Sequence, residues 1–220
     1  MDKSFAAADP RLAEYVNRIF GDEDELLQGV RERQAQAGLP PIQVAPLDGL
    51  HLEVLVRGFG AKKAVEIGTL GGYSGLRILR GLGDGGTLHT FELDEAHAAV
   101  ARETFRLGGF ADRAHVHVGP ALSRLPEIEA EAPFDLVFID ADKDHYPMYL
   151  AWAAKHLRIG GVVLGDNAFL WGGVCEAPEG PEAHRILAMQ RFNEALARGG
   201  RFRATMIPTG EGLALGVKIR

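Results

Sequence analysis

Cysteine is nearly absent from this chain of 220 residues, since Cys175 is the only one. A single cysteine cannot form an intramolecular disulfide, so a disulfide-held fold is excluded and a reducing, cytoplasmic setting is expected. Basic residues are also scarce relative to acidic ones, because 24 Lys and Arg against 30 Asp and Glu give a formal charge of −6. This balance provides no basic surface for nucleic acid or an anionic membrane, and it favours work on small molecules.

Long hydrophobic runs, internal repeats and low-complexity segments are missing as well. The N-terminal residues contain no apolar core of signal-peptide length, and no later segment could span a bilayer. What is present is an ordinary globular composition, with 46% hydrophobic and 25% charged residues. No linker rich in Pro, Gly or Ser divides the chain. We therefore expect one α/β domain over residues 1–220, with residues 1–60 forming a helical segment packed on it.

Apolar residues recur at helical spacing over residues 10–38, and a further helix is predicted at 47–58, after a break at Pro40 and Pro41. Strands are predicted at 64–67, 87–93, 115–118, 134–139, 161–164, 203–207 and 213–219, and helices at 73–82, 95–107, 146–157 and 182–197. This alternation predicts a doubly wound, mostly parallel seven-stranded sheet with helices on both faces. The turn at 208–212 makes the last two strands an antiparallel edge hairpin.

Ligands of such sheets bind beyond the carboxyl ends of the strands. There the first strand runs into a glycine-rich turn, VEIGTLGGYSG (65–75). A dinucleotide fingerprint from Gly68 would require glycine where Leu70 and Tyr73 stand, and no Gly-Lys-Ser/Thr follows for a phosphate loop. The turn thus matches neither of the common phosphate-binding patterns.

An acid, Glu66, precedes the first glycine of this turn, and a second acid, Glu92, ends the next strand. An acid before the turn suits a positively charged cofactor without phosphate, and an acid at the second position can hold both ribose hydroxyls. Together they point to S-adenosylmethionine. The alternative is a plain glycine-rich turn in which Glu66 forms a salt bridge.

The fourth predicted strand ends in FIDADKDHY (138–146), and the fifth ends in Gly-Asp-Asn (165–167). Carboxylates gathered at one strand end repel one another unless something positive is bound. Carboxylate and amide oxygens suit Mg²⁺ or Ca²⁺ and not Zn²⁺, so Asp140, Asp166 and Asn167 form a candidate three-oxygen site. The alternative is that the aspartates cap the following helices, which is our expectation for Asp142 and Asp144.

Lys143 stands among these acids. It is either a solvated lysine paired with a neighbouring aspartate, or a general base favoured by an adjacent cation and partial burial.

At this point the chain resembles a known family. VEIGTLGGYSG is similar to the cofactor loop of the cation-dependent class I O-methyltransferases, which include catechol and caffeoyl-CoA O-methyltransferases. Other segments resemble blocks of that family, in the family's order and over nearly the whole chain: QVAP (43–46) with Gly49, FELDEAHAAVARE (91–103), ADRAHVHVGPAL (111–122), FDLVFIDADKDHY (134–146), Asp166-Asn167 with Trp171, and IPTGEGLAL (207–215).

The resemblance implies a set of residues around S-adenosylmethionine. It places Glu66, Gly68 and Ser74 at the methionine end, and Glu92 at the ribose. It also places Ala121 beside the adenine and Val44 near the cofactor. We expect Asp140 to contact the cofactor region as well as the metal.

For the cation and the chemistry, the resemblance selects between the alternatives left open above. It implies that Asp140, Asp166 and Asn167 bind Mg²⁺ or another hard divalent cation such as Mn²⁺ or Ca²⁺. Lys143, three residues after the first metal aspartate, is implied to be the general base. The expected reaction is methyl transfer to a hydroxyl of a catechol-like vicinal diphenol. A homodimer packed through the N-terminal helices is also implied, and the expected partner is a small phenolic molecule, without nucleic acid or membrane.

The segment from Asp166 to Trp171 is one residue longer than the family's usual spacing. Because this loop would border the acceptor pocket, the identity of the acceptor cannot be carried over from any relative. Three alternatives remain: a nicotinamide-dependent dehydrogenase on a related sheet, a methyltransferase acting on a different acceptor such as RNA or protein, and a non-catalytic binding module.

Overall fold

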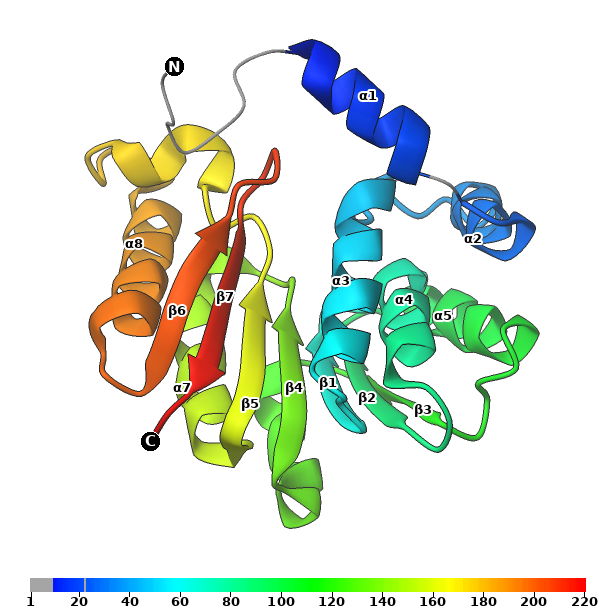
Figure 1. Cartoon of the computed structure of the whole chain (residues 1–220). Helices are drawn as coiled ribbons and strands as arrows, with labels where there is room; N and C mark the ends of the chain where they lie inside the picture. Colours follow the sequence, from blue (N-terminus) through cyan, green and yellow to red (C-terminus); the bar gives the residue numbers. More distant parts are fainter. Residues whose placement is uncertain (1–9, 22) are drawn as a thin grey trace.

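The computed structural model describes residues 10–21 and 23–220, so residues 1–9 of the predicted N-terminal segment lie outside the described part. Helices α1 (Pro10–Phe20), α2 (Glu25–Gln36) and α3 (Pro46–Gly58) precede the sheet. α3 packs on α4 (Tyr73–Leu82), and α2 contacts α4 and α5 (Glu95–Leu107). α2 and α3 thus pack on helices that cover one face of the sheet, whereas α1 stands apart from the sheet (Figure 1). The assignment of residues 1–220 to a single domain stays a prediction.

The sheet has the predicted seven strands: β1 (Lys63–Ile67), β2 (Thr87–Glu92), β3 (Ala114–Val118), β4 (Phe134–Ile139), β5 (Leu157–Gly165), β6 (Phe202–Ile207) and β7 (Leu213–Lys218). Their order is β3-β2-β1-β4-β5-β7-β6. The first five strands pair in parallel, and β7 runs antiparallel to both of its neighbours. The predicted fold class is confirmed, with one refinement: the antiparallel strand lies second from the edge, and β6 is the edge strand.

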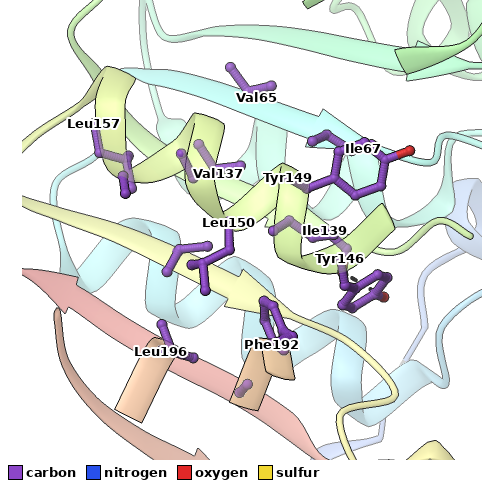
Figure 2. Packing of buried hydrophobic residues seen from close by; sticks show 14 of the residues in the cluster. Val65, Ile67, Val137, Ile139, Tyr146, Tyr149, Leu150, Leu157, Phe192 and Leu196 are labelled. Atoms are coloured by element: carbon purple, nitrogen blue, oxygen red, sulfur yellow. Dashed lines mark hydrogen bonds between the residues drawn. The ribbon is translucent and has the colours of Figure 1, made fainter. Parts of the chain in front are cut away.

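Alternate residues of the central strands enter two hydrophobic cores, one on each face of the sheet. Val65 and Ile67 of β1 and the matching residues of β4 pack against α7 (Tyr146–His156) and α8 (Ala183–Arg198), as Figure 2 shows. Ala64 and Phe138 enter the opposite core, with α3, α4 and α5. Each large side chain buried in this way contributes about 1.5–3 kcal/mol relative to exposure. This burial on both faces fixes the strand ends that carry the site.

Four short elements were not predicted: α6 (Ala121–Arg124) and the 3₁₀ helices η1 (Leu125–Glu131), η2 (Lys143–His145) and η3 (Leu170–Cys175). One or two turns of helix are too short to produce a hydrophobic period. In the described ranges, no helix combines the length and apolar character needed to cross a membrane.

Candidate active site

The register of the parallel strands brings their carboxyl ends to one edge of the sheet. Ile67 lies opposite both Phe91 and Ile139, and Ile139 lies opposite Gly165. The residues that come next on β2, β1, β4 and β5 therefore form a row, in the spatial order Glu92, Gly68, Asp140 and Asp166. The row crosses the boundary between β1 and β4, where the strand order reverses and ligands of such sheets bind. The prediction that these motifs meet in space is confirmed.

A cavity of about 2030 Å³ opens along this row. A pocket for one drug-sized ligand is usually about 300–1,000 Å³, so this cavity has room for a cofactor and an acceptor together. The predicted site residues that line it are Val44, Gly68, Ser74, Glu92, Ala121, Asp140, Lys143 and Asn167. Glu66 and Asp166 are buried and do not line it. The individual roles given to these residues from sequence stay predictions.

Gly68 is required by the way the first turn meets the end of β4. Its φ is +99°, and a Cβ atom there would lie 1.9 Å from the carbonyl oxygen of Asp140. The backbone N–H of Asp140 donates to the carbonyl of Ile67 at 2.8 Å. Any side chain at position 68 would push the two strand ends apart, so this glycine sets the position of Asp140.

Glu92 is held by the same turn. Its Oε2 accepts the backbone N–H of Leu70 at 2.7 Å and that of Thr69 at 3.3 Å, while its Oε1 accepts that of Asp94 at 3.0 Å. Leu70 reaches this position with a positive φ of 48°, which is uncommon for a residue with a side chain. The carboxylate is thereby fixed in place where it lines the cavity.

Glu66 is fully buried, and its partners are hydroxyl groups. Ser74 Oγ donates to Oε1 and Thr90 Oγ1 donates to Oε2, both at 2.6 Å. The alternative of a salt-bridged Glu66 is therefore wrong. Burial raises the pKa of the carboxyl to about 8, although the two hydroxyl hydrogen bonds lower it in part. The group thus holds its proton well above the usual range for a glutamate.

Glu66→Gln is expected to remove a pH dependence of stability. The carboxyl pKa is about 8 in the folded chain against an ordinary value of 4.5, so the folded state binds the proton more tightly than the unfolded state. The stabilisation is full below the ordinary pKa and is lost as the pH rises to about 8, with an upper bound of about 5 kcal/mol. Urea denaturation at about pH 5 and about pH 9 measures it. The variant should gain stability relative to the wild type at the higher pH. If the free energies of unfolding of the variant and the wild type differ by the same amount at both pH values, the raised pKa is contradicted.

Asp140, Asp166 and Asn167 stand together at the ends of β4 and β5, as predicted. Asp166 is 3% exposed, and its Oδ1 is buried without a hydrogen-bond partner. Burial, and after it the negative charge of Asp140, raises the pKa of Asp166 to about 7. A buried, unpartnered oxygen beside a second carboxylate fits a hard cation. In the described part of the chain no three His, Cys, Asp or Glu residues form a metal-type cluster, so the third protein ligand here would be the amide oxygen of Asn167.

Lys143 is held over this pair of strand ends. Its Nζ donates to the hydroxyl of Tyr146 at 2.7 Å and to Oδ1 of Asp140 at 3.2 Å. The Tyr146 hydroxyl lies 3.1 Å from the carbonyl of Ile139 and 3.0 Å from that of Asp166. Burial raises the pKa of Tyr146 well above its ordinary value, so this hydroxyl remains a donor to the carbonyls. The side chain of Lys143 is only 11% exposed, so the alternative of a solvated lysine is wrong, although the lysine does pair with an aspartate. Its role as a general base stays a prediction.

The expectation that Asp142 and Asp144 cap the following helices is wrong. Asp142 accepts the Tyr149 hydroxyl at 2.8 Å and pairs with His145, and Asp144 lies 3.4 Å from His184. Neither η2 nor α7 has a side-chain cap. α7 continues directly from η2, without the extended residue that a side-chain cap requires.

Sequence reasoning also missed two residues of the site, Tyr146 and Glu211. Tyr146 lies at the end of the FIDADKDHY segment, where only the charged residues were weighed. Glu211, in the β6–β7 turn, lines the cavity and accepts a hydrogen bond from Asn167. Because β6 runs parallel to the first five strands, its carboxyl end reaches the same edge of the sheet. An acidic residue in the turn after β6 was therefore the sequence feature that could have indicated Glu211 as a site residue.

The sequence profile described as "O-methyltransferase" matches residues 17–219. The catechol O-methyltransferase of Mycobacterium tuberculosis is 38% identical over 191 residues, which are 87% of this chain and 84% of that protein.

The solved structures of two O-methyltransferases illustrate the same fold. The O-methyltransferase of Bacillus cereus, in complex with SAH, is 38% identical with a TM-score of 0.87, and the match covers 94% of this chain and 97% of that one. The O-methyltransferase TomG of Streptomyces achromogenes, involved in tomaymycin synthesis and in complex with SAM, is 34% identical with a TM-score of 0.88, over 98% and 100% of the two chains.

Proposed function

The chain belongs to the O-methyltransferase family, and from that premise we propose that it transfers a methyl group from S-adenosylmethionine (SAM) to one hydroxyl of a catechol-like vicinal diphenol, with the help of a divalent cation. The buried, unpartnered Oδ1 of Asp166 beside Asp140 carries this proposal. A cation would supply the partner that this oxygen lacks, and the cavity beside it has room for two ligands.

S-adenosylmethionine fits the part of the row at the ends of β1 and β2, which contains Gly68 and Glu92. Glu92 offers a fixed carboxylate on the cavity wall, suited to ribose hydroxyls. Ser74 lines the same wall and is held by Glu66. Two structural relatives are in complex with SAH or SAM, which supports the same cofactor here.

Asp140, Asp166 and Asn167 would hold the cation, and Mg²⁺ suits their oxygen atoms best, with Mn²⁺ or Ca²⁺ as the other candidates. When bound, the cation lowers the pKa of the two diphenol hydroxyls and fixes their position, and S-adenosylmethionine supplies the methyl group. Lys143 accepts at Nζ the proton of the hydroxyl that is methylated. Tyr146 holds that Nζ in place through a hydrogen bond of 2.7 Å. Orientation of the two reactants provides much of the rate enhancement, since methyl transfer needs no covalent enzyme intermediate.

The test is a panel of catechols, caffeoyl thioesters and flavonoids incubated with labelled methyl donor, with and without a chelator. We expect label on a vicinal diphenol, and loss of labelling with chelator that added Mg²⁺ restores. Labelling that is indifferent to chelator would reject the cation, and labelling of none of the diphenols would reject the acceptor class.

We also propose that two copies of this chain associate through α1. Four apolar side chains on this helix, Leu12, Tyr15, Ile19 and Phe20, are 47–55% exposed. Isolated helices shorter than about 12–15 residues are marginal in water, and α1 has 11 residues. A second copy can cover this face, because each copy would present the same apolar helix.

The double variant Tyr15→Glu/Ile19→Glu is expected to sediment as a monomer at concentrations where the wild type sediments as a dimer. Placing two carboxylates on the apolar face makes its burial unfavourable. Glu14→Gln, on the same helix, is the matched control and should remain dimeric. A monomeric wild type, or a dimeric double variant, would reject the interface.

A further inference from the structure

The β6–β7 turn is joined directly to the segment that follows β5. The backbone N–H groups of Ala168 and Phe169 donate to the carbonyls of Gly212 and Glu211 at 2.9 and 3.0 Å. Gly212 has a φ of +79°, and a Cβ atom there would lie 2.6 Å from the Phe169 ring. The two loops are therefore in direct contact at Gly212 and Phe169, and this contact places the side chain of residue 211 next to Asn167.

Glu211 uses both carboxylate oxygens on this segment. Asn167 Nδ2 donates to Oε2 at 2.5 Å, and Trp171 Nε1 donates to Oε1 at 3.2 Å. A carboxylate can only accept, so the NH₂ end of the amide must face it. Oδ1 is then the end of the amide that remains free to bind a cation, and it is the only end that can.

We propose that Glu211 is a positioning residue, which orients the Asn167 amide so that Oδ1 is available to the cation and holds the Trp171 indole at the cavity wall. This inference rests on the proposed function. Trp171 lines the cavity although it is 68% exposed, and it has a positive φ of 51°. One side chain thus links the cation site to the wall against which an acceptor would lie.

Substitutions at position 211 can separate this role from a structural one. The backbone hydrogen bond from Phe169 to the carbonyl of residue 211 is available to any side chain. Glu211→Gln preserves the size of the side chain, but it offers only one accepting oxygen to two N–H donors. Partners that orient a metal ligand typically contribute 10–100-fold to metal affinity, and we expect a loss of about that size for Mn²⁺ in this variant.

The decisive measurement is a double-mutant cycle on Mn²⁺ affinity, read by the electron paramagnetic resonance of free Mn²⁺ without cofactor or acceptor. The variants are Glu211→Gln, Asn167→Ala and the two combined. If Glu211 acts through Asn167, its substitution should weaken Mn²⁺ binding in the wild-type background and have little effect in the Asn167→Ala background. Glu179→Gln, an exposed glutamate outside the cavity, is the matched control.

A second readout uses Trp171 itself. The chain has two tryptophans, so Trp152→Phe leaves Trp171 as the only indole emitter. In that background Glu211→Gln should change the emission of Trp171 before any cation is added, and thermal unfolding should show that the fold is kept. If Glu211→Gln does not fold, Glu211→Asp serves in the same cycle, with an intermediate loss expected.

The outcomes distinguish this inference from the function on which it rests. If the wild type binds Mn²⁺ no better than Asp166→Asn, the cation site itself is rejected, and the role of Glu211 with it. The cation site stands and the positioning role is overturned in two cases. In the first, Glu211→Gln binds Mn²⁺ as tightly as the wild type. In the second, Glu211→Gln weakens Mn²⁺ binding by the same factor in the wild-type and the Asn167→Ala backgrounds.

Discussion

The Asp166→Asn variant is expected to keep its fold and its affinity for S-adenosylmethionine but to lose cation-dependent methylation, with kcat/KM falling by at least about 10³-fold. A catalytic cation contributes several kcal/mol to transition-state stabilisation, and each 1.36 kcal/mol is tenfold in rate. Asp166 is not part of the cavity wall, and Glu92 and Ser74 are left unchanged, so cofactor binding should survive. Methyl-transfer kinetics at saturating Mg²⁺, with calorimetric titration of the cofactor, measure both effects.

When no cation is present, Asp166→Asn should not lower the stability of the fold and should increase it at higher pH. Because the pKa of Asp166 is raised to about 7 by burial and by Asp140, the stabilisation linked to its proton is full below the ordinary pKa and is lost as the pH rises through about 7. Asparagine carries no charge, so above that pH the variant should unfold at a temperature at least as high as the wild type. Added Mg²⁺ should raise the unfolding temperature of the wild type alone.

Asp144→Asn is the matched control for this prediction. Asp144 lies in the same charged segment, but it pairs with His184 outside the main cavity. An exposed pair of this kind contributes little to stability, so neither activity nor Mg²⁺-dependent stabilisation should change. Equal losses in the two variants would mean that general negative charge at this edge, and not a specific ligand, is responsible.

The regular elements could be predicted because local and long-range preferences agree. The strand predicted at 134–139 and the helix predicted at 73–82 have the observed bounds of β4 and α4. Each carries a clear hydrophobic pattern and each is packed in the core, so nothing in the fold overrides the sequence signal. Short elements such as η3 could not be predicted in this way. Trp171 and Gly172 within η3 have positive φ values of 51° and 94°, and a hydrophobic pattern does not indicate such backbone angles.

The row of site residues could be predicted for a related reason. Parallel strands end at one edge, so the residues following β1, β2, β4 and β5 must be neighbours once the strand order is known. The contact between Asn167 and Glu211 could not be predicted, since the two are 44 positions apart in sequence. It depends on the antiparallel register that sets Gly165 opposite Ala214, and on β7 lying between β5 and β6. The glycine turn lacks the dinucleotide fingerprint, and membership in the O-methyltransferase family now excludes the alternative of a nicotinamide dehydrogenase.

The second large effect is expected for Lys143→Met, which should lower kcat by about 10²–10⁴-fold, the usual contribution of a general base. Methionine keeps an unbranched apolar side chain of similar length, but it removes the amine and with it the contact of the ammonium with the Tyr146 ring, 4.6 Å from its centroid. The ammonium also lies 3.2 Å from Asp140 Oδ1. Its removal should therefore leave Mn²⁺ affinity unchanged or increase it, because a competing positive charge is lost.

Replacement of Lys143 by arginine separates a general base from a simple ion pair. A general base must be able to lose its proton before it can accept one from the acceptor, which an amine can do. If Lys143 served only to neutralise Asp140, Lys143→Arg would retain most of the rate, since arginine keeps the charge but cannot lose its proton. A general base requires instead that Lys143→Arg be as slow as Lys143→Met. Tyr146→Phe should fall between these variants and the wild type, because it removes the hydroxyl that holds Nζ at 2.7 Å but leaves the amine in place. A rate for Lys143→Arg close to that of the wild type would reject the base and leave the lysine as the counter-ion of Asp140.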